Sequence, residues 1–334
     1  MNQSPLVSVI ITNFNGIKYL RNCFESLYAG SYKNIEIIFV DNGSADGSLE
    51  FVHQAFKNIK TIDNKDNLGL SIASNRGAEI ADGKYLFFYN NDTIADTDLI
   101  SNLVKAMEND SKIGIAGCKT YTYDGKYLIN AGVACDIFGY PYGKGKPFYV
   151  DAGIFIRKDL FYKIGKFDEK MFLYGEDRDI CWRCWLYGYK VAVIENAKFL
   201  HNSACITRDL KQYRTNINKR FWGELNSLRS ILKNYSVGFI FFILLLFMLM
   251  NLVEILAFFI KGKFKIIKYV YIKSYIENLK SIEDTLRKRK TIQQERRVSD
   301  FKIVNHMSKI SGKLKLFLDM GIPKFSENVK YGNA

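Results

Sequence analysis

Short apolar runs rich in β-branched residues alternate with segments of helical periodicity over the first ninety residues of the chain. The runs cover residues 7–12, 35–40 and 85–89, and each ends at a polar turn. Strands that alternate with helices predict a parallel α/β sheet with right-handed crossovers. Ligands of such sheets bind at the carboxyl ends of the strands. The polar residues at those ends are Asn13, Asp41 and Asp92.

The alternation resumes after residue 150. The pattern predicts a strand at residues 152–156, helices at 158–164 and 180–187, and a strand at 191–194 that leads to His201. Hydrophobic residues make up 48% of the sequence and aromatic residues 15%. This is enough apolar surface for a large core. The predicted fold class is therefore α/β, with a mostly parallel sheet flanked by helices.

Residues 237–260 form an almost continuous apolar run that is long enough to cross a bilayer. Asn251 and Glu254 interrupt the run, and basic residues flank both of its ends. The positive-inside rule then places both ends in the cytoplasm, which an in-plane helix or a re-entrant hairpin satisfies better than a single span. We predict a globular domain at residues 1–233 and a membrane-associated helical region at residues 234–334.

Most of the net charge of +14 lies after residue 260. A basic region of this kind attracts anionic lipid or nucleic acid. Because no pattern of a nucleic-acid-binding module accompanies it, anionic lipid is the expected partner and nucleic acid is not. The first residues lack the pattern of a secretory signal, so the expected location is the cytoplasmic face of the cell membrane.

Cys181 and Cys184 form a Cys-x-x-Cys pair, and no second pair accompanies it. Zinc is therefore not expected, and both thiols are expected to pack on a helix of a reduced, cytosolic protein. Trp182 and Trp185 in the same segment are expected to pack in the core.

Two acidic motifs carry the chemistry expected of this scaffold. Asp92 closes the motif at residues 90–92, and Glu176 and Asp177 stand within the motif at residues 175–179. One carboxylate site can hold a divalent cation with a phosphorylated substrate, and the other can supply a general base. Each motif also has a structural alternative, because Asp92 can cap a helix and the second cluster can interact with a helix dipole.

Six motifs follow one another along the chain, and in this order they form a specific signature. They are VSVIITNFNG at residues 7–16, VDNGSADGS at 40–48, NLG at 67–69, NRG at 75–77, NNDT at 90–93 and GEDRD at 175–179. Over roughly residues 5–230, this set resembles the inverting family 2 glycosyltransferases of the GT-A fold, in their rhamnosyltransferase-like bacterial branch. The resemblance implies a GT-A domain and a nucleotide-diphospho-sugar donor, linked to UDP or dTDP.

The resemblance assigns eight residues to the donor. They are Asn13, Asn15, Asp41, Asn67, Gly69, Asn75, Gly77 and Asn91. A carboxylate and side-chain amides can bind a base or ribose, and glycines let the chain approach a nucleotide closely. Turn formation is the alternative for Asn13, Asn15 and Asp41, and loop or helix-cap roles are the alternative for Asn67, Gly69, Asn75 and Gly77.

The same resemblance places Mg²⁺ or Mn²⁺ on Asp92, with His201 after the last strand as a second ligand. The family's usual Asp-x-Asp motif has Asn90 at its first position here, which leaves Asp92 as its one full negative charge. His201 has a structural role as its alternative. By resemblance, Asp177 is the general base of a single inverting displacement, and Glu176 and Asp179 are supporting residues.

The expected function is transfer of a single sugar from the nucleotide-sugar to a lipid-linked glycan acceptor in surface polysaccharide assembly. The membrane segment favours a lipid-linked acceptor, because both reactants then share a surface. The Gln-x-x-Arg-Trp signature of processive synthases is absent, which favours single-sugar addition. The alternatives are transfer to a protein or simple lipid, and a catalytically inactive nucleotide-sugar sensor. The sequence does not predict an oligomeric state.

Overall fold

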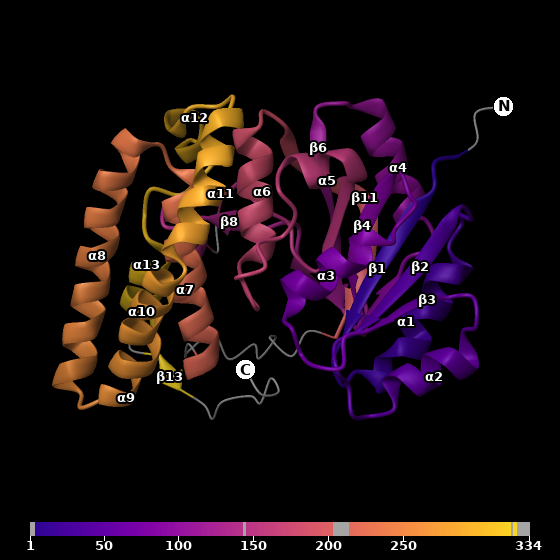
Figure 1. Cartoon of the computed structure of the whole chain (residues 1–334), viewed down its shortest axis with the longest axis horizontal. Helices are drawn as coiled ribbons and strands as arrows, with labels where there is room; N and C mark the ends of the chain where they lie inside the picture. Colours follow the sequence, from indigo (N-terminus) through magenta and orange to yellow (C-terminus); the bar gives the residue numbers. More distant parts are fainter. Residues whose placement is uncertain (1–3, 143–144, 203–213, 322, 326–334) are drawn as a thin grey trace.

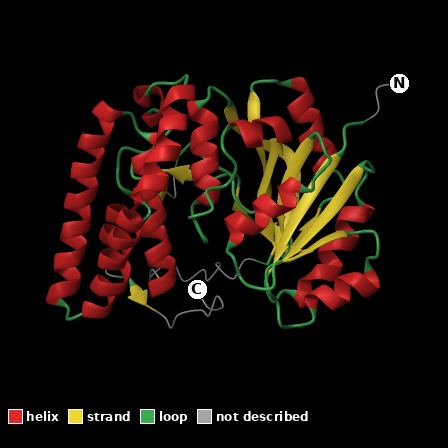
Figure 2. Cartoon of the chain, viewed as in Figure 1, coloured by secondary structure: helices red, strands yellow, loops and turns green. Residues whose placement is uncertain are grey.

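The computed structural model describes residues 4–142, 145–202, 214–321 and 323–325. In this part of the chain, a nine-stranded sheet with flanking helices forms one half of the molecule, and a helical region forms the other (Figures 1 and 2). The sheet strands are β1 Val7–Asn13, β2 Ile35–Asp41, β3 Lys60–Asp63, β4 Tyr85–Asn90, β5 Thr93–Ala95, β6 Ile113–Thr122, β7 Leu128–Asn130, β10 Gly153–Arg157 and β11 Lys190–His201. Short pairs are formed by β8 Ala134–Cys135 with β9 Pro141–Tyr142, and by β12 Arg214–Thr215 with β13 Lys324–Phe325.

Six of the helices belong to the sheet half or border it, and the others follow residue 216. The first set is α1 Ile17–Ala29, α2 Ser48–Ala55, α3 Leu70–Glu79, α4 Leu99–Asn109, α5 Lys158–Lys163 and α6 Glu176–Leu186. The second set is α7 Ile217–Asn234, α8 Val237–Ile260, α9 Phe264–Ile266, the π-helical η1 Ile267–Ile272, α10 Lys273–Lys280, α11 Ile282–Glu295, α12 Asp300–Val304 and α13 Gly312–Met320.

The strand order is β3-β2-β1-β4-β10-β6-β11-β5, with β7 paired to β6. The pairs β3–β2, β2–β1, β1–β4 and β6–β11 are parallel, whereas β10 runs antiparallel to both of its neighbours. The predicted mostly parallel α/β sheet is therefore confirmed. The register sets Asn13 opposite Asp41, and Thr12 opposite Asn90, so the polar strand ends meet at one edge.

The sequence analysis missed β6, which lies inside the sheet. Its small residues explain this, because they replace the β-branched side chains that usually indicate a strand. A Cβ on Gly117 would lie 2.3 Å from Val150, and one on Gly114 would lie 2.6 Å from the Cys184 sulfur. The close packing of these neighbours against β6 requires glycine at both positions.

Helix α6 begins at Glu176, four residues earlier than the predicted helix at 180–187. Trp182, Cys181 and Cys184 are fully buried on it, and both thiols are free. Trp182 makes edge-on ring contacts with Phe148 and Tyr235. The prediction that these residues pack on a helix is confirmed.

One hydrophobic core runs from the sheet into the helical region. It joins Ile10 and Leu86 of the sheet to Ile231 of α7, Phe247 of α8 and Ile292 of α11. Helix α7 packs against α6, α8, α10 and α11, and Figure 1 shows α8 at the outer edge of this region, far from the sheet. The two predicted regions, residues 1–233 and 234–334, therefore share one core.

Candidate active site

The first cavity lies at the carboxyl ends of β1, β2 and β4 and has a volume of about 270 Å³. Four of the predicted donor residues line it, Asn13, Asn67, Gly69 and Asn91. Asn91 donates a hydrogen bond to Asn13 at 2.5 Å, and Asn13 donates to Asp41 at 3.1 Å. Side-chain amides are therefore held at the rim by contacts between adjacent strand ends.

The cavity also has lining residues that the sequence analysis did not select. Asn42 donates a hydrogen bond to Asn67 at 2.8 Å, and Phe172 and Leu173 close the side opposite the strands. A Cβ on Gly69, whose φ is +85°, would lie 2.6 Å from the Phe172 ring. Gly69 is thus needed so that Phe172 can approach. The position of Phe172 depends on this long-range contact, so no local pattern indicates it.

Asp41 and Asn15 lie beside the first cavity but do not line it. Asp41 is buried and accepts hydrogen bonds from the Ser44 backbone at 2.8 Å and from Asn13. Asn15, at a φ of +53°, accepts from the Ala45 backbone at 2.8 Å. Both residues hold the turns after β1 and β2 in place, which is the turn-forming alternative stated for them.

Asn75 and Gly77 lie on α3, away from the first cavity. Asn75 donates to the Phe167 carbonyl at 3.0 Å and accepts from the Phe167 amide at 3.1 Å. A Cβ on Gly77 would lie 2.5 Å from Ile10 of β1. Both residues therefore fix the packing of α3, and the structure does not bring them to the other predicted donor residues.

Asp92 and His201 meet at the end of β11. Asp92 Oδ1 lies 3.1 Å from His201 Nε2, and Asn90 Nδ2 lies 3.3 Å from the same nitrogen. Two ligands at right angles around an octahedral ion, each at roughly 2.1 Å, are about 3 Å apart. The pair therefore fits a divalent cation. Among the described residues, no third His, Cys, Asp or Glu joins them, so substrate oxygens and water would complete the shell.

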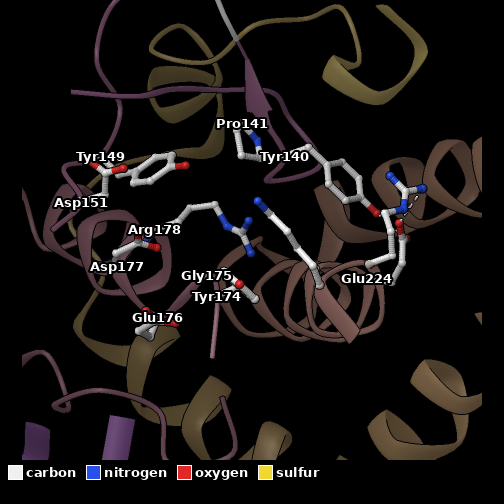
Figure 3. A pocket seen from close by; sticks show the side chains of 13 residues that line it. Tyr140, Pro141, Tyr149, Asp151, Tyr174, Gly175, Glu176, Asp177, Arg178 and Glu224 are labelled. Carbon is white, nitrogen blue, oxygen red and sulfur yellow. Dashed lines mark hydrogen bonds and ion pairs between the residues drawn. The ribbon is translucent and has the colours of Figure 1, made fainter. Parts of the chain in front are cut away.

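The second cavity has a volume of about 350 Å³ and lies beside the N-terminus of α6 (Figure 3). Glu176 and Asp177 line it, together with Asp151, Tyr149 and Arg178. The Asp177 carboxylate accepts a hydrogen bond from the Arg178 backbone at 2.6 Å. Glu176 Oε2 is buried and has no hydrogen-bond partner among the described residues. These carboxylates retain lone pairs for a ligand.

Burial raises the pKa of Asp177 above its ordinary value, and the nearby Asp151 charge raises it further. Burial also raises the pKa of Glu176, with a contribution from Asp177. The pKa of Asp151 is raised by burial as well. All three carboxyl groups therefore keep their protons to a higher pH than ordinary carboxyl groups do. Asp177, with its pKa raised to about 7, can accept a proton near neutral pH, which is the property that a general base requires.

Asp179 lies two residues after Asp177, and its pKa is lowered rather than raised. Burial acts to raise its pKa, but the charges of Lys233 and Arg183 outweigh it and hold the pKa at about 2. Lys233 Nζ lies 3.0 Å and Arg183 Nη2 lies 2.9 Å from the Asp179 carboxylate. Asp179 therefore ties α6 to α7 and is not available for proton transfer.

Helix α7 supplies a wall of the second cavity that the sequence analysis did not predict. Tyr140 donates a hydrogen bond to Glu224 of α7 at 2.5 Å, and Lys313 of α13 lies 2.8 Å from the same carboxylate. Lys219 and Arg220 of α7 also line the cavity. The helical region therefore completes the cavity that holds Asp177.

The mostly parallel sheet, the polar cavity at its strand ends and the adjacent corner formed by Asp92 and His201 are the features expected of the GT-A class of fold. The fold resembles that of a mannosyltransferase, PcManGT from Pyrobaculum calidifontis in complex with GDP-Man and Mn²⁺, with a TM-score of 0.52 and 15% identity over 70% of this chain and 64% of that one. It also resembles S. aureus TarS residues 1–349, with a TM-score of 0.52 and 15% identity over 86% and 90% of the chains. At this identity the likeness shows the fold.

The family model "Glycosyl transferase family 2" matches residues 8–192, and the chain belongs to this family. An uncharacterised glycosyltransferase of Haemophilus influenzae is 34% identical over 149 residues, which are 43% of this chain and 44% of the relative. One from Methanocaldococcus jannaschii is 28% identical over 240 residues, or 69% and 80% of the two chains. The chain spans less than half of the H. influenzae relative.

Proposed function

We propose that the protein is an inverting glycosyltransferase that moves a single sugar from a UDP- or dTDP-linked donor to a lipid-linked glycan acceptor. The observation that carries the proposal is the ligand-accessible carboxylate pair of Glu176 and Asp177, in a cavity next to the Asp92–His201 corner. Asp151 links the two places, because its charge raises the pKa of Asp177 and the charge of His201 lowers the pKa of Asp151 itself. Solved relatives of the fold that contain GDP-Man or UDP with Mn²⁺ support a nucleotide-sugar donor and a divalent cation.

In the proposed reaction, the acceptor hydroxyl gives its proton to Asp177 as its oxygen attacks the anomeric carbon of the donor. The bond from that carbon to the diphosphate oxygen breaks, and its electron pair leaves with the nucleoside diphosphate. A single attack from the face opposite the leaving group inverts the anomeric centre. Asp92 and His201 would hold Mg²⁺ or Mn²⁺, which offsets the charge of the leaving diphosphate when it is bound.

Helix α8 supports an acceptor that lies in a membrane. By length and composition, it is the one helix among the described residues that could cross a bilayer. Its outward side chains are large and apolar, and those exposed by at least half are Val237, Phe241, Phe242, Leu245, Leu249, Leu252, Val253, Leu256, Phe259 and Ile260. A patch of this extent on a soluble surface indicates contact with lipid or protein.

The polar residues of α8 face the protein. Asn251 is buried and donates to Tyr275 at 2.9 Å, and Glu254 lies 2.9 Å from Arg220 Nη2. A spanning α8 would carry these contacts and the charged helix α7 into lipid, which is costly. We therefore favour α8 lying in the plane of the membrane, at its cytoplasmic face, with the basic residues after it near anionic headgroups.

Transfer by the full-length protein is the direct test. The protein would be incubated with UDP- and dTDP-sugars and Mn²⁺, with and without prenyl diphosphate-linked glycans, and the products analysed by mass and by anomeric NMR signals. We expect acceptor-dependent transfer of one sugar with inversion. A retained anomer would contradict the mechanism. Absence of both transfer and donor hydrolysis would instead support the inactive sensor.

A further inference from the structure

Arg178 is a buried cation that the proposed reaction does not use. It follows Asp177 on α6, its residue is 4% exposed, and its side chain points into the second cavity (Figure 3). Its Nε and Nη2 are buried and donate no hydrogen bond within the described part of the chain. Among the described residues, no carboxylate forms an ion pair with it.

Arg178 differs from the other buried arginines among the described residues, because each of those forms an ion pair with a carboxylate. Arg183 and Arg229 are equally buried, yet Arg183 pairs with Asp179, and Arg229 contacts Asp168, Asp284, Ser281 and Thr285. Buried N–H groups without acceptors cost free energy, because Nε and Nη2 of Arg178 have lost water and gained no hydrogen bond in return. Such a group is retained where a ligand supplies the missing acceptors.

The guanidinium is held in place by backbone contacts. A Cβ on Gly139 would lie 3.2 Å from Arg178 Nε, and one on Gly175 would lie 2.7 Å from Nη2. Both glycines have positive φ, of +81° and +97°. The planar guanidinium therefore packs against the backbones of Gly139 and Gly175. These packing contacts, rather than hydrogen bonds from Nε and Nη2, fix its orientation.

We propose that Arg178 anchors an anionic oxygen group, a phosphate or a sugar carboxylate, on the acceptor. The planar fork of arginine matches two oxygens of such a group with two parallel hydrogen bonds. Lys219 lines the same cavity and adds positive charge to it. The assignment of this cavity to the acceptor rests on the proposed function.

Asp151 and Arg178 take different directions in the second cavity. In Figure 3, the Arg178 side chain extends away from Asp151 and toward the middle of the cavity. An anion bound to Arg178 would therefore lie in the middle of this cavity.

Equilibrium binding without a donor tests the anchor independently of turnover. Full-length protein in EDTA would be titrated by calorimetry with inorganic pyrophosphate, methyl β-glucuronide and the neutral methyl β-glucoside. We expect one or both anions to bind more tightly than the glucoside. Arg178→Met should weaken anion binding about 10- to 100-fold, and Arg178→Lys less, whereas Asp96→Ala, which removes a surface ion pair with Lys198, should leave it unchanged.

The two anions distinguish the source of the charge, because pyrophosphate represents a lipid-linking diphosphate and glucuronide represents an acidic sugar. Equal anion affinities in the wild type and Arg178→Met would overturn the inference, and so would a wild type that binds neither anion better than the glucoside. A wild type that binds an anion through Arg178 but transfers no sugar would support the anchor and refute the proposed function.

The melting temperatures of variants distinguish an arginine that binds a ligand from one that stabilises the fold. Arg178→Met removes an unpartnered charge, so the melting temperature should stay the same or rise. The matched variant Arg229→Met removes one of the three cations around the buried Asp168 and should lower the melting temperature by on the order of 10 °C. A comparable loss in Arg178→Met would assign Arg178 to the fold and overturn the inference.

Discussion

Helix α6 carries charged residues of the same kinds in two opposite situations. Glu176, Asp177 and Arg178 line the second cavity and keep free hydrogen-bonding atoms. Asp179 and Arg183, on the side toward α7, pair with each other, and Lys233 completes the group. The pKa of Asp177 is raised by burial, whereas the pKa of Asp179 is held at about 2 by its partners. Burial alone therefore does not separate a functional carboxylate from a structural one, but pairing does.

The paired side of α6 belongs to a larger network between the sheet half and the helical region. Asp168 contacts Arg229 and Lys233 of α7 and Lys288 of α11. Three cations around Asp168 hold its pKa well below the ordinary value, although burial alone would raise it. The network fixes α7, and α7 in turn provides a wall of the cavity that holds Asp177.

The largest effect on stability should come from breaking this network. Lys233→Met leaves Asp168 and Asp179 short of a buried cation and should lower the free energy of unfolding by about 3–5 kcal/mol. Urea unfolding of the full-length protein measures this. If Lys233→Met matched the wild type in stability, the distinction between the two sides of α6 would not hold.

The next largest effect should be on donor binding, when the Asp92–His201 corner is changed. Asp92→Ala removes the carboxylate beside His201 and should weaken Mn²⁺-dependent donor binding by roughly 10- to 100-fold or more. Calorimetry with UDP and dTDP, each with and without Mn²⁺, measures the change. Asp96→Ala is the control, because Asp96 forms a surface ion pair with Lys198. Identical metal-dependent affinities in Asp92→Ala and the wild type would remove Asp92 from the site.

The smallest expected effect is on membrane binding. Leu245→Ser with Leu252→Ser removes two exposed apolar side chains of α8 and should lower partitioning onto anionic vesicles by roughly tenfold. Leu128→Ser is the control, since Leu128 is equally exposed but lies on β7. Sedimentation with vesicles gives the bound fraction. Unchanged binding in the double variant would mean that α8 covers another protein surface.

The sequence predicts the strand-end part of the site because the signal there is local. An apolar run followed by a polar turn places Asn13 and Asp92 without knowledge of the rest of the fold. Helix α7 could not be predicted in the same way, because its apolar pattern is interrupted by Arg220, Glu224 and Lys233, which are buried. The partners of these residues lie far away in sequence, so their burial is visible only in the folded chain.

The same limit applies within the acidic motif at residues 175–179. The sequence leaves a supporting role and a helix-terminal charge cluster open for Glu176 and Asp179 alike. The three-dimensional partners separate them, since Lys233 and Arg183 occupy Asp179, whereas Glu176 Oε2 stays free of partners among the described residues. The sequence does not indicate a role for Arg178. Its role is inferred from the missing hydrogen-bond partners of Nε and Nη2, which no sequence pattern shows.

We propose that Asp177 is the general base, and that it differs from Asp179 because no cation among the described residues pairs with its carboxylate. The most direct test is the pH dependence of sugar transfer by the wild type and by Asp177→Asn, which keeps the side-chain shape but cannot take a proton. A general base works only when it is deprotonated. Because the pKa of Asp177 is raised, wild-type transfer should decline as the pH falls, and the decline should begin at a pH well above the ordinary aspartate pKa of about 3.9. Asp177→Asn should lose about 10²- to 10⁴-fold in transfer above the raised pKa of Asp177, should not show the decline at lower pH, and should keep donor affinity within a few-fold. Near-normal turnover with the same pH profile in Asp177→Asn would contradict the account.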